Sequence, residues 1–188
     1  MKNLLERLQA ADLVALDTDQ VNALSTDQIA ALTTAQVAGL TTAQMAALDT
    51  SLLNALTTAQ VGALGSAQVA ALGTDQVAAL ETGDLRALST LALRAWGTDQ
   101  VNALGSDQVA ALTTAQVAAL TSVQITNLTS TNLNALTSSQ FATLASNQVG
   151  ALSSTQVSTL ETADLVAIGS TGLRAWNSGQ VEIGRAHV

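Results

Sequence analysis

An eight-residue phrase such as TTAQVAAL, at residues 113–120, recurs along the chain without insertion or deletion. Counted from Met1, residues 1–184 divide into consecutive octads, so that octad 1 covers residues 1–8 and octad 23 covers residues 177–184. Leucine, isoleucine or tryptophan occupies the eighth position through octad 22, and an apolar residue stands three positions before it. Because one octad is too short to enclose a core, neighbouring octads must stack and share their apolar surface.

The first half of each octad has the features of a helix start. The consensus [TSDG]-[TS]-[AD]-Q-V-x-A-L places residues favoured at helix N-caps in its first position, for example Asp17, Ser25 and Thr33. Glutamine follows three residues later, which is the spacing of a capping box, and the apolar residues before the N-cap and at the fifth position have the spacing of a hydrophobic staple. We therefore expect one helix to begin in every octad.

One continuous helix does not suit this period. Eight residues overshoot two helical turns by about 80°, so the leucines would spiral around a long helix instead of forming a seam. A β-solenoid is the alternative, because short threonine-rich repeats can build one. The helix-favouring run Gln-Val-Ala-Ala-Leu and the apolar spacing of three favour helices. The sequence predicts an all-α solenoid, or superhelix, of very short helices with one helix per octad.

A longer period is superimposed on the octads. Residues 17–96 align with residues 97–176 without gaps, and both blocks end in Leu-Arg-Ala-Trp. We predict one continuous solenoid domain made of these two ten-octad blocks. Residues 1–16, with their denser charges, are expected to form an N-terminal capping segment, and residues 177–188 a C-terminal cap or irregular tail.

The charge balance excludes several partners. The chain has 6 Lys and Arg against 14 Asp and Glu, and a formal net charge of -8. Binding to nucleic acid depends largely on basic side chains, so no nucleic-acid role is expected. No apolar run approaches the ~18 residues that a membrane span needs, so no membrane insertion is expected. Glu6 and Arg7 interrupt the N-terminal segment before the apolar run of a secretory signal can form.

The sequence offers no candidate for catalytic chemistry. The single histidine, His187, lies in the irregular tail, and cysteine is absent, so no metal site, cofactor or catalytic residue is expected. The acidic pairs Glu81–Asp84 and Glu161–Asp164 occupy N-cap and N3 positions, where carboxylates favour a helix N-terminus. We expect the protein not to be an enzyme.

Four residues stand out as candidates for binding. Trp96 and Trp176 replace the eighth-position leucine, and Arg94 and Arg174 stand two residues before them. Core filling by the tryptophans and surface ion pairing by the arginines are the alternative interpretations.

The octads of type LTTDQVxAL, over residues 17–181, resemble repeats of very large bacterial surface or secreted proteins of the adhesin or haemolysin type. This resemblance implies that the segment comes from a larger chain at the cell surface or outside the cell. The octad is also similar to the opening of the DNA-reading repeats of TAL effectors. The proline of those repeats is Thr or Ser here, and the longer unit with its base-reading loop is missing, so DNA binding does not carry over.

Three functions follow from these observations. The first is a non-enzymatic structural scaffold, a spacer or stalk segment of a bacterial repeat protein. The second is a module that binds a protein or glycan on the solenoid surface, using irregular octads such as TSTNLNAL at residues 129–136 and the two tryptophan octads. The third is ice binding through regularly spaced threonines. The oligomeric state and the hand of the superhelix stay open.

Overall fold

A computed structural model of the chain describes residues 10–185, and among these residues every regular element is a helix. The prediction of an all-α fold of very short helices is confirmed, and the β-solenoid alternative is wrong for the described residues. Residues 1–9 of the predicted capping segment and residues 186–188 of the predicted tail, including His187, lie outside them.

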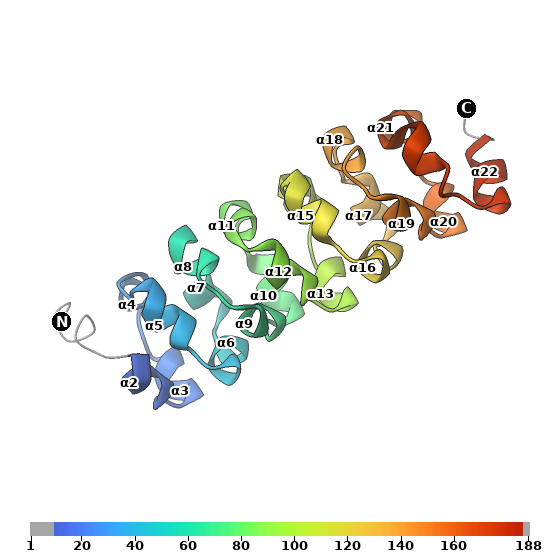
Figure 1. The fold of residues 1–188 in the computed structure, drawn as a ribbon. Helices are drawn as coiled ribbons and strands as arrows, with labels where there is room; N and C mark the ends of the chain where they lie inside the picture. Colours follow the sequence, from blue (N-terminus) through green and yellow to red (C-terminus); the bar gives the residue numbers. More distant parts are fainter. Residues whose placement is uncertain (1–9, 186–188) are drawn as a thin grey trace. The chain divides into compact units, whose positions relative to one another are not determined.

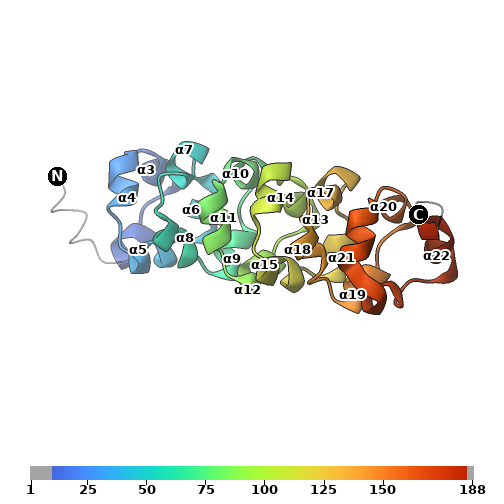
Figure 2. The ribbon, with the colours of Figure 1, turned by 90° about the horizontal axis from the view of Figure 1, so that it is seen from above.

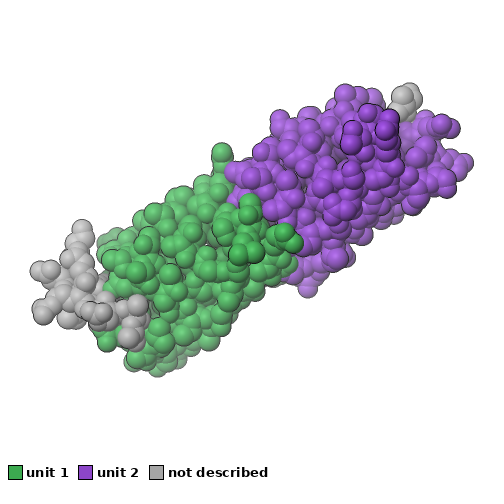
Figure 3. All heavy atoms as spheres, in the orientation of Figure 1, with its two compact units in different colours: residues 1–96 green, residues 97–188 purple. Residues whose placement is uncertain are grey.

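The chain forms two compact units, residues 1–96 and residues 97–188 (Figure 3). The boundary between them is the position at which the second ten-octad block begins. In the first unit each described octad contains one helix: α2 (Ala10–Val14), α3 (Thr18–Asn22), α4 (Thr26–Ala30), α5 (Thr34–Gly39), α6 (Thr42–Ala47), α7 (Thr50–Leu53), α8 (Thr58–Gly62), α9 (Ser66–Ala70), α10 (Thr74–Ala79), α11 (Thr82–Ala87) and α12 (Thr90–Arg94).

The second unit repeats this organisation as far as octad 20. Its helices are α13 (Thr98–Asn102), α14 (Ser106–Ala111), α15 (Thr114–Ala119), α16 (Ser122–Thr126), α17 (Ser130–Asn134), α18 (Ser138–Phe141), α19 (Ser146–Gly150), α20 (Ser154–Val157), α21 (Thr162–Leu173) and α22 (Ser178–Arg185). Helix α21 covers octads 21 and 22, but Gly169 at φ 70° kinks it at the octad boundary. The helix direction therefore still changes at that boundary.

Most of the helices begin with hydrogen bonds between the N-cap residue and the glutamine three positions later. The Asp17 N–H donates to Gln20 Oε1 at 3.0 Å, and the Gln20 N–H donates to Asp17 Oδ1 at 2.8 Å. Where the first position is glycine, as at Gly65, only the bond to the glutamine oxygen is made. The eighth residue closes the helix, because its N–H turns back to the fifth-position carbonyl, as between Leu40 and Val37 at 3.1 Å.

The core of each unit consists of the fifth and eighth positions of successive octads. Val37 and Val61 are fully buried, and Leu40 and Leu64 are nearly so. Helices three octads apart pack together, such as α5 with α8 and α8 with α11 (Figures 1 and 2). Each octad thus shares its apolar residues with the octads of the adjacent turns, as the stacking of such short units requires.

A ladder of glutamine side chains also joins octads that are four apart. The amide nitrogen of Gln60 donates to the carbonyls of Ile29 and Leu32, at 3.0 and 2.6 Å. These acceptors lie 31 and 28 residues earlier and are the fifth and eighth residues of octad 4. The same pair of bonds, at 2.6–3.2 Å, recurs at Gln44, Gln60, Gln68 and Gln76 in the first unit and at Gln140, Gln148 and Gln156 in the second.

The ladder satisfies backbone groups that such short helices leave unpaired. An α-helix has no internal partner for its first four N–H groups and its last four carbonyls, which is most of the backbone in helices of four to six residues. One buried glutamine accepts from an N-cap N–H of its own octad and donates both amide hydrogens to carbonyls of an earlier octad. Because an unpaired buried polar group costs about 1–3 kcal/mol, each glutamine removes several such penalties.

Gln20 and Gln28, near the start of the first unit, differ from the later glutamines. They lie in octads 3 and 4, and residues 1–188 contain no octad four positions before these. Within the described residues their oxygens hold the Asp17 and Ser25 N–H groups, but their amide nitrogens make no hydrogen bond. Gln20 is exposed and Gln28 is half-buried, whereas Gln60 is only 2% exposed.

This difference gives a matched pair of substitutions. Gln60→Glu keeps an oxygen for the Thr57 N–H but removes both donors and buries a carboxylate beside the Ile29 and Leu32 carbonyls. We expect a loss of about 2–4 kcal/mol in the free energy of unfolding, measured by urea denaturation at neutral pH. The same change at Gln20 is expected to alter it by less than about 0.5 kcal/mol. Equal losses for the two variants would show that the inter-octad bonds contribute nothing.

Candidate functional site

The octads that lack glutamine at the fourth position are the irregular places in this structure. Octad 7 has Leu52 there, and octad 17 has Asn132. In both octads an asparagine from four octads earlier takes over the missing bond. Asn22 Oδ1 accepts the Asp49 N–H at 3.1 Å, and Asn102 Oδ1 accepts the Thr129 N–H at 3.0 Å.

The same two asparagines also donate a hydrogen bond to a backbone carbonyl of a second octad. The Asn22 amide nitrogen donates to the Ala47 carbonyl at 2.6 Å, and that of Asn102 donates to the Asn127 carbonyl at 2.7 Å. Asn54 and Asn134 make the equivalent bonds 25 residues ahead, to Ala79 and Thr159.

The sequence contains a signal for these bonds that the octad consensus leaves out. Asparagine occupies the sixth position in octads 3, 7, 13 and 17, and each of these octads stands four before an octad without glutamine. The four residues are Asn22, Asn54, Asn102 and Asn134. Asn22 and Asn102 thus compensate for the glutamine that is missing four octads later, whereas the Asn54 oxygen has no hydrogen-bond partner in the described residues.

Two of the octads without glutamine carry a buried aspartate instead. Asp84 is 5% exposed and Asp164 is 8% exposed. Asp164 accepts the Glu161 N–H at 3.0 Å, so the predicted capping role of the pair Glu161–Asp164 agrees with this bond. Burial raises the pKa of the Asp164 carboxyl; the Glu161 N–H bond lowers it, and the negative charge of Glu161 raises it further.

Asp164 stands at the fourth position of its octad, where the side chain of a regular octad donates a hydrogen bond to an earlier carbonyl. Asn132, which has a side chain of the same length at the same octad position, donates to the Leu104 carbonyl 28 residues back, at 3.0 Å. The corresponding carbonyl for Asp164 is that of Leu136. An ionised carboxylate cannot donate to it, whereas a protonated carboxyl group can.

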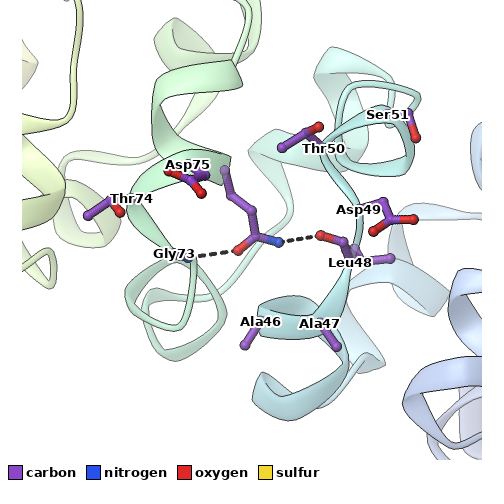
Figure 4. Close-up of a pocket in the computed structure, with 10 residues that line it drawn as sticks. Ala46, Ala47, Leu48, Asp49, Thr50, Ser51, Gly73, Thr74 and Asp75 are labelled. Atoms are coloured by element: carbon purple, nitrogen blue, oxygen red, sulfur yellow. Dashed lines mark hydrogen bonds between the residues drawn. The ribbon is translucent and has the colours of Figure 1, made fainter.

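A polar groove of about 600 Å³ lies in the first unit between octads 6, 7 and 10 (Figure 4). Asp49, Thr50 and Ser51 line one side, and Gly73, Thr74 and Asp75 line the other. The Gln76 amide crosses between Gly73 and Leu48, accepting the N–H of the first at 2.7 Å and donating to the carbonyl of the second at 2.7 Å. The groove is therefore bounded by a ladder bond.

A second hollow, of about 490 Å³, lies at the C-terminal end of the second unit. Its lining residues are Leu165, Leu173, Trp176, Val181, Gly184 and Arg185. They belong to octads 21, 22 and 23 and to the residue that follows. The lining is mostly apolar, and Leu173, Trp176 and Val181 are only half-buried.

Of the four predicted binding residues, the two tryptophans are buried or half-buried and the two arginines are exposed. Trp96 is 4% exposed, and its indole N–H donates to the Val69 carbonyl at 2.9 Å. Trp176 makes the equivalent bond to Val149 at 3.2 Å but is half-buried. Arg94 and Arg174 are exposed. Trp96 thus has little free surface for a ligand, and binding at these positions stays a prediction.

The described residues contain no group of three or more His, Asp and Glu side chains that could hold a metal ion. None of the helices from α2 to α22 is long and apolar enough to cross a membrane.

The family model of the ALTTAQ repeat matches the chain at residues 5–42, 16–50, 45–82 and 77–114, which together span more than half of its length. The chain belongs to the ALTTAQ repeat family. The ALTTAQ match at residues 45–82 contains both Met45 and Gln76, which the ladder joins, so one match includes one complete inter-octad step. No curated protein matches the chain.

The buried Asp164 gives a pH-dependent prediction. Because its pKa is raised in the folded state, its unfavourable effect on stability is present at neutral pH and disappears as the pH falls through that pKa. Asp164→Asn supplies a permanent donor, as Asn132 does. We expect about 1 kcal/mol of stabilisation at pH 7, which raises the unfolding midpoint by about 2–4 °C.

Thermal unfolding of both proteins between about pH 4 and pH 8 measures this effect, and the difference between them should shrink toward the acid end. Helices α18 and α19, which pack most closely against α21, contain no titratable side chain, and Glu161 is the charge that acts on Asp164. Asp99→Asn, at an exposed position in the first turn of α13, is the control and should give no stabilisation. A stabilisation independent of pH would contradict this assignment.

Proposed function

We propose that the chain is a non-enzymatic structural scaffold, a spacer or stalk segment within a larger bacterial surface or secreted protein. Membership of a tandem-repeat family supports the structural part of this proposal. The resemblance of the octads to repeats of large adhesin-like proteins supports the surface location.

The observation that carries the proposal is the equivalence of the ladder steps. Gln68 and Gln148 lie in different units, yet each donates to the fifth- and eighth-position carbonyls of the octad four before its own. Interchangeable steps allow the number of octads, and hence the length of the stack, to vary without a new interface. A spacer needs this property, whereas a binding site depends on particular residues at one place.

Many of the buried polar side chains have structural partners. The buried glutamines bond to backbone groups, as Gln60 does with Thr57, Ile29 and Leu32, and Asp164 bonds to the Glu161 N–H. Buried polar groups that recur in most octads and bond to the backbone stabilise a fold and leave few of these groups free for a substrate.

Deleting one whole octad tests the proposal. Removal of residues 57–64 keeps the eight-residue register, so Gln68 and Gln76 meet the fifth- and eighth-position carbonyls of octads 4 and 5. One ladder step is lost, because Asp84 then faces the carbonyls of octad 6 to which Gln76 donates in the intact chain. We expect the helical circular dichroism per residue to be unchanged and the loss of stability to stay near 1–3 kcal/mol.

Removal of residues 57–63 is the matched control, because it shifts the register by one residue and misplaces the following glutamines. We expect this variant to lose much of its helical signal in the first unit. If both deletions were equally harmful, the octads would not be interchangeable and the spacer proposal would fail.

A further inference from the structure

Asn127 begins a sequence motif that the octad consensus does not contain. With Leu128 and Thr129 it forms Asn-x-Thr, and no other asparagine of the chain is followed two residues later by serine or threonine. Asn-x-Ser/Thr is the acceptor sequence of N-linked glycosylation, which requires a surface position. Asparagine is also unusual at the seventh octad position, where octads 2–22 otherwise have alanine, glycine or threonine.

The structure places this motif in an exposed turn of the second unit. Residues 127–129 connect α16 to α17, and Asn127 is exposed. Its amide nitrogen donates to the Val123 carbonyl at 2.9 Å, within the same octad. Asn102, by contrast, bonds with its side chain to the backbone of Asn127 and Thr129 in other octads. The Asn127 side chain thus joins no other octad, and its second amide hydrogen has no partner among residues 10–185.

The surface around this turn is made without charged side chains. Residues 108–160 contain no Asp, Glu, Lys, Arg or His. Val123 stands one helical turn before Asn127, on the same side of the helix, and is 64% exposed. Because charged side chains keep protein surfaces apart in solution, this stretch has little to oppose association.

The first block has neither the motif nor the exposed valine at the corresponding positions. Residues 123, 127 and 129 of the second block correspond, in the ungapped alignment, to Ala43, Ala47 and Asp49. The acceptor motif and the exposed apolar side chain therefore occur together in the second block, at a place where the first block has an alanine pair and a carboxylate.

We propose that Asn127 is a glycosylation site, and that its sugar covers Val123 and supplies hydrophilic surface to the charge-free stretch. The Asn127 amide nitrogen attacks the anomeric carbon of a sugar that is activated as a diphosphate ester. The N–C bond forms while the bond from that carbon to the phosphate oxygen breaks. The diphosphate leaves with the bonding electrons, and one amide proton passes to a base of the transferring enzyme.

The modification is compatible with the fold. The glycosylated nitrogen keeps one hydrogen, so the Val123 carbonyl can still accept a bond from it. A sugar is bulky and hydrophilic, and at Asn127 it lies beside the exposed valine. The proposal goes beyond the spacer role and does not depend on it, since deletion of an octad and the covalent state of Asn127 are measured separately.

Mass spectrometry of the chain isolated from the organism that makes it tests the modification. We expect the fragment that contains Asn127 to carry at least one sugar that survives mild alkali, which eliminates sugars from serine and threonine but not from asparagine. Asn127→Gln and Thr129→Ala should both lose the sugar. Thr129→Ser keeps the motif and the N-cap of α17, and Asn147→Gln changes an exposed asparagine outside the motif, so both should retain it. An unmodified fragment, or a sugar that alkali removes, would overturn the proposal.

Solubility measurements test what the sugar does. The chain produced in cells without N-linked glycosylation should reach its solubility limit at a several-fold lower concentration than the glycosylated chain. Val123→Asp should restore most of this loss in the unmodified chain, because it removes the exposed apolar side chain and adds a charge. Ala43→Asp adds the same charge at the corresponding exposed position and should have a smaller effect. Equal solubility of the two forms, or equal gains from the two aspartate variants, would contradict the covering role.

Discussion

The buried glutamine amide is the interaction on which this fold depends. Helices of four to six residues cannot pair most of their own backbone groups, and apolar packing does nothing for those groups. A glutamine such as Gln76 accepts from the Gly73 N–H and donates to the Met45 and Leu48 carbonyls, so one side chain joins the start of one helix to the end of another. Packing between octads three apart then encloses the valines and leucines around the bonded amides.

The same requirement accounts for the irregular octads. Where Leu52 replaces the glutamine, the Asp49 N–H is bonded by Asn22 from an earlier octad. Where Asp164 replaces it, the N-cap bond survives, but a carboxylate cannot donate to a carbonyl. In the first block, Asn54 stands four octads before Asp84, and its Oδ1 is a buried side-chain atom without a hydrogen-bond partner in the described residues. The ladder tolerates such exceptions because each one affects a single step.

Much of the local structure could be predicted from the sequence. The N-cap residues, the glutamine three positions later and the apolar pair define where each helix begins and which side is buried, as at Asp17, Gln20 and Val21. The inter-octad half of the ladder could not be predicted in this way. The separations of 28 and 31 residues between Gln60 and its acceptors follow from how the octads of one unit stack, which no local pattern specifies. The kink at Gly169 could not be predicted either, since the matching residue of the first block is Ser89 with ordinary backbone angles.

Hydrogen exchange of the glutamine side-chain amides, followed by NMR, tests the ladder most directly. If both amide hydrogens of Gln60, Gln68 and Gln76 bond to buried carbonyls, they should exchange at least about tenfold more slowly than those of Gln20 and Gln28, whose nitrogens make no such bond. Exchange at the same free-solvent rate for all five residues would contradict the ladder, even if the helices themselves were intact.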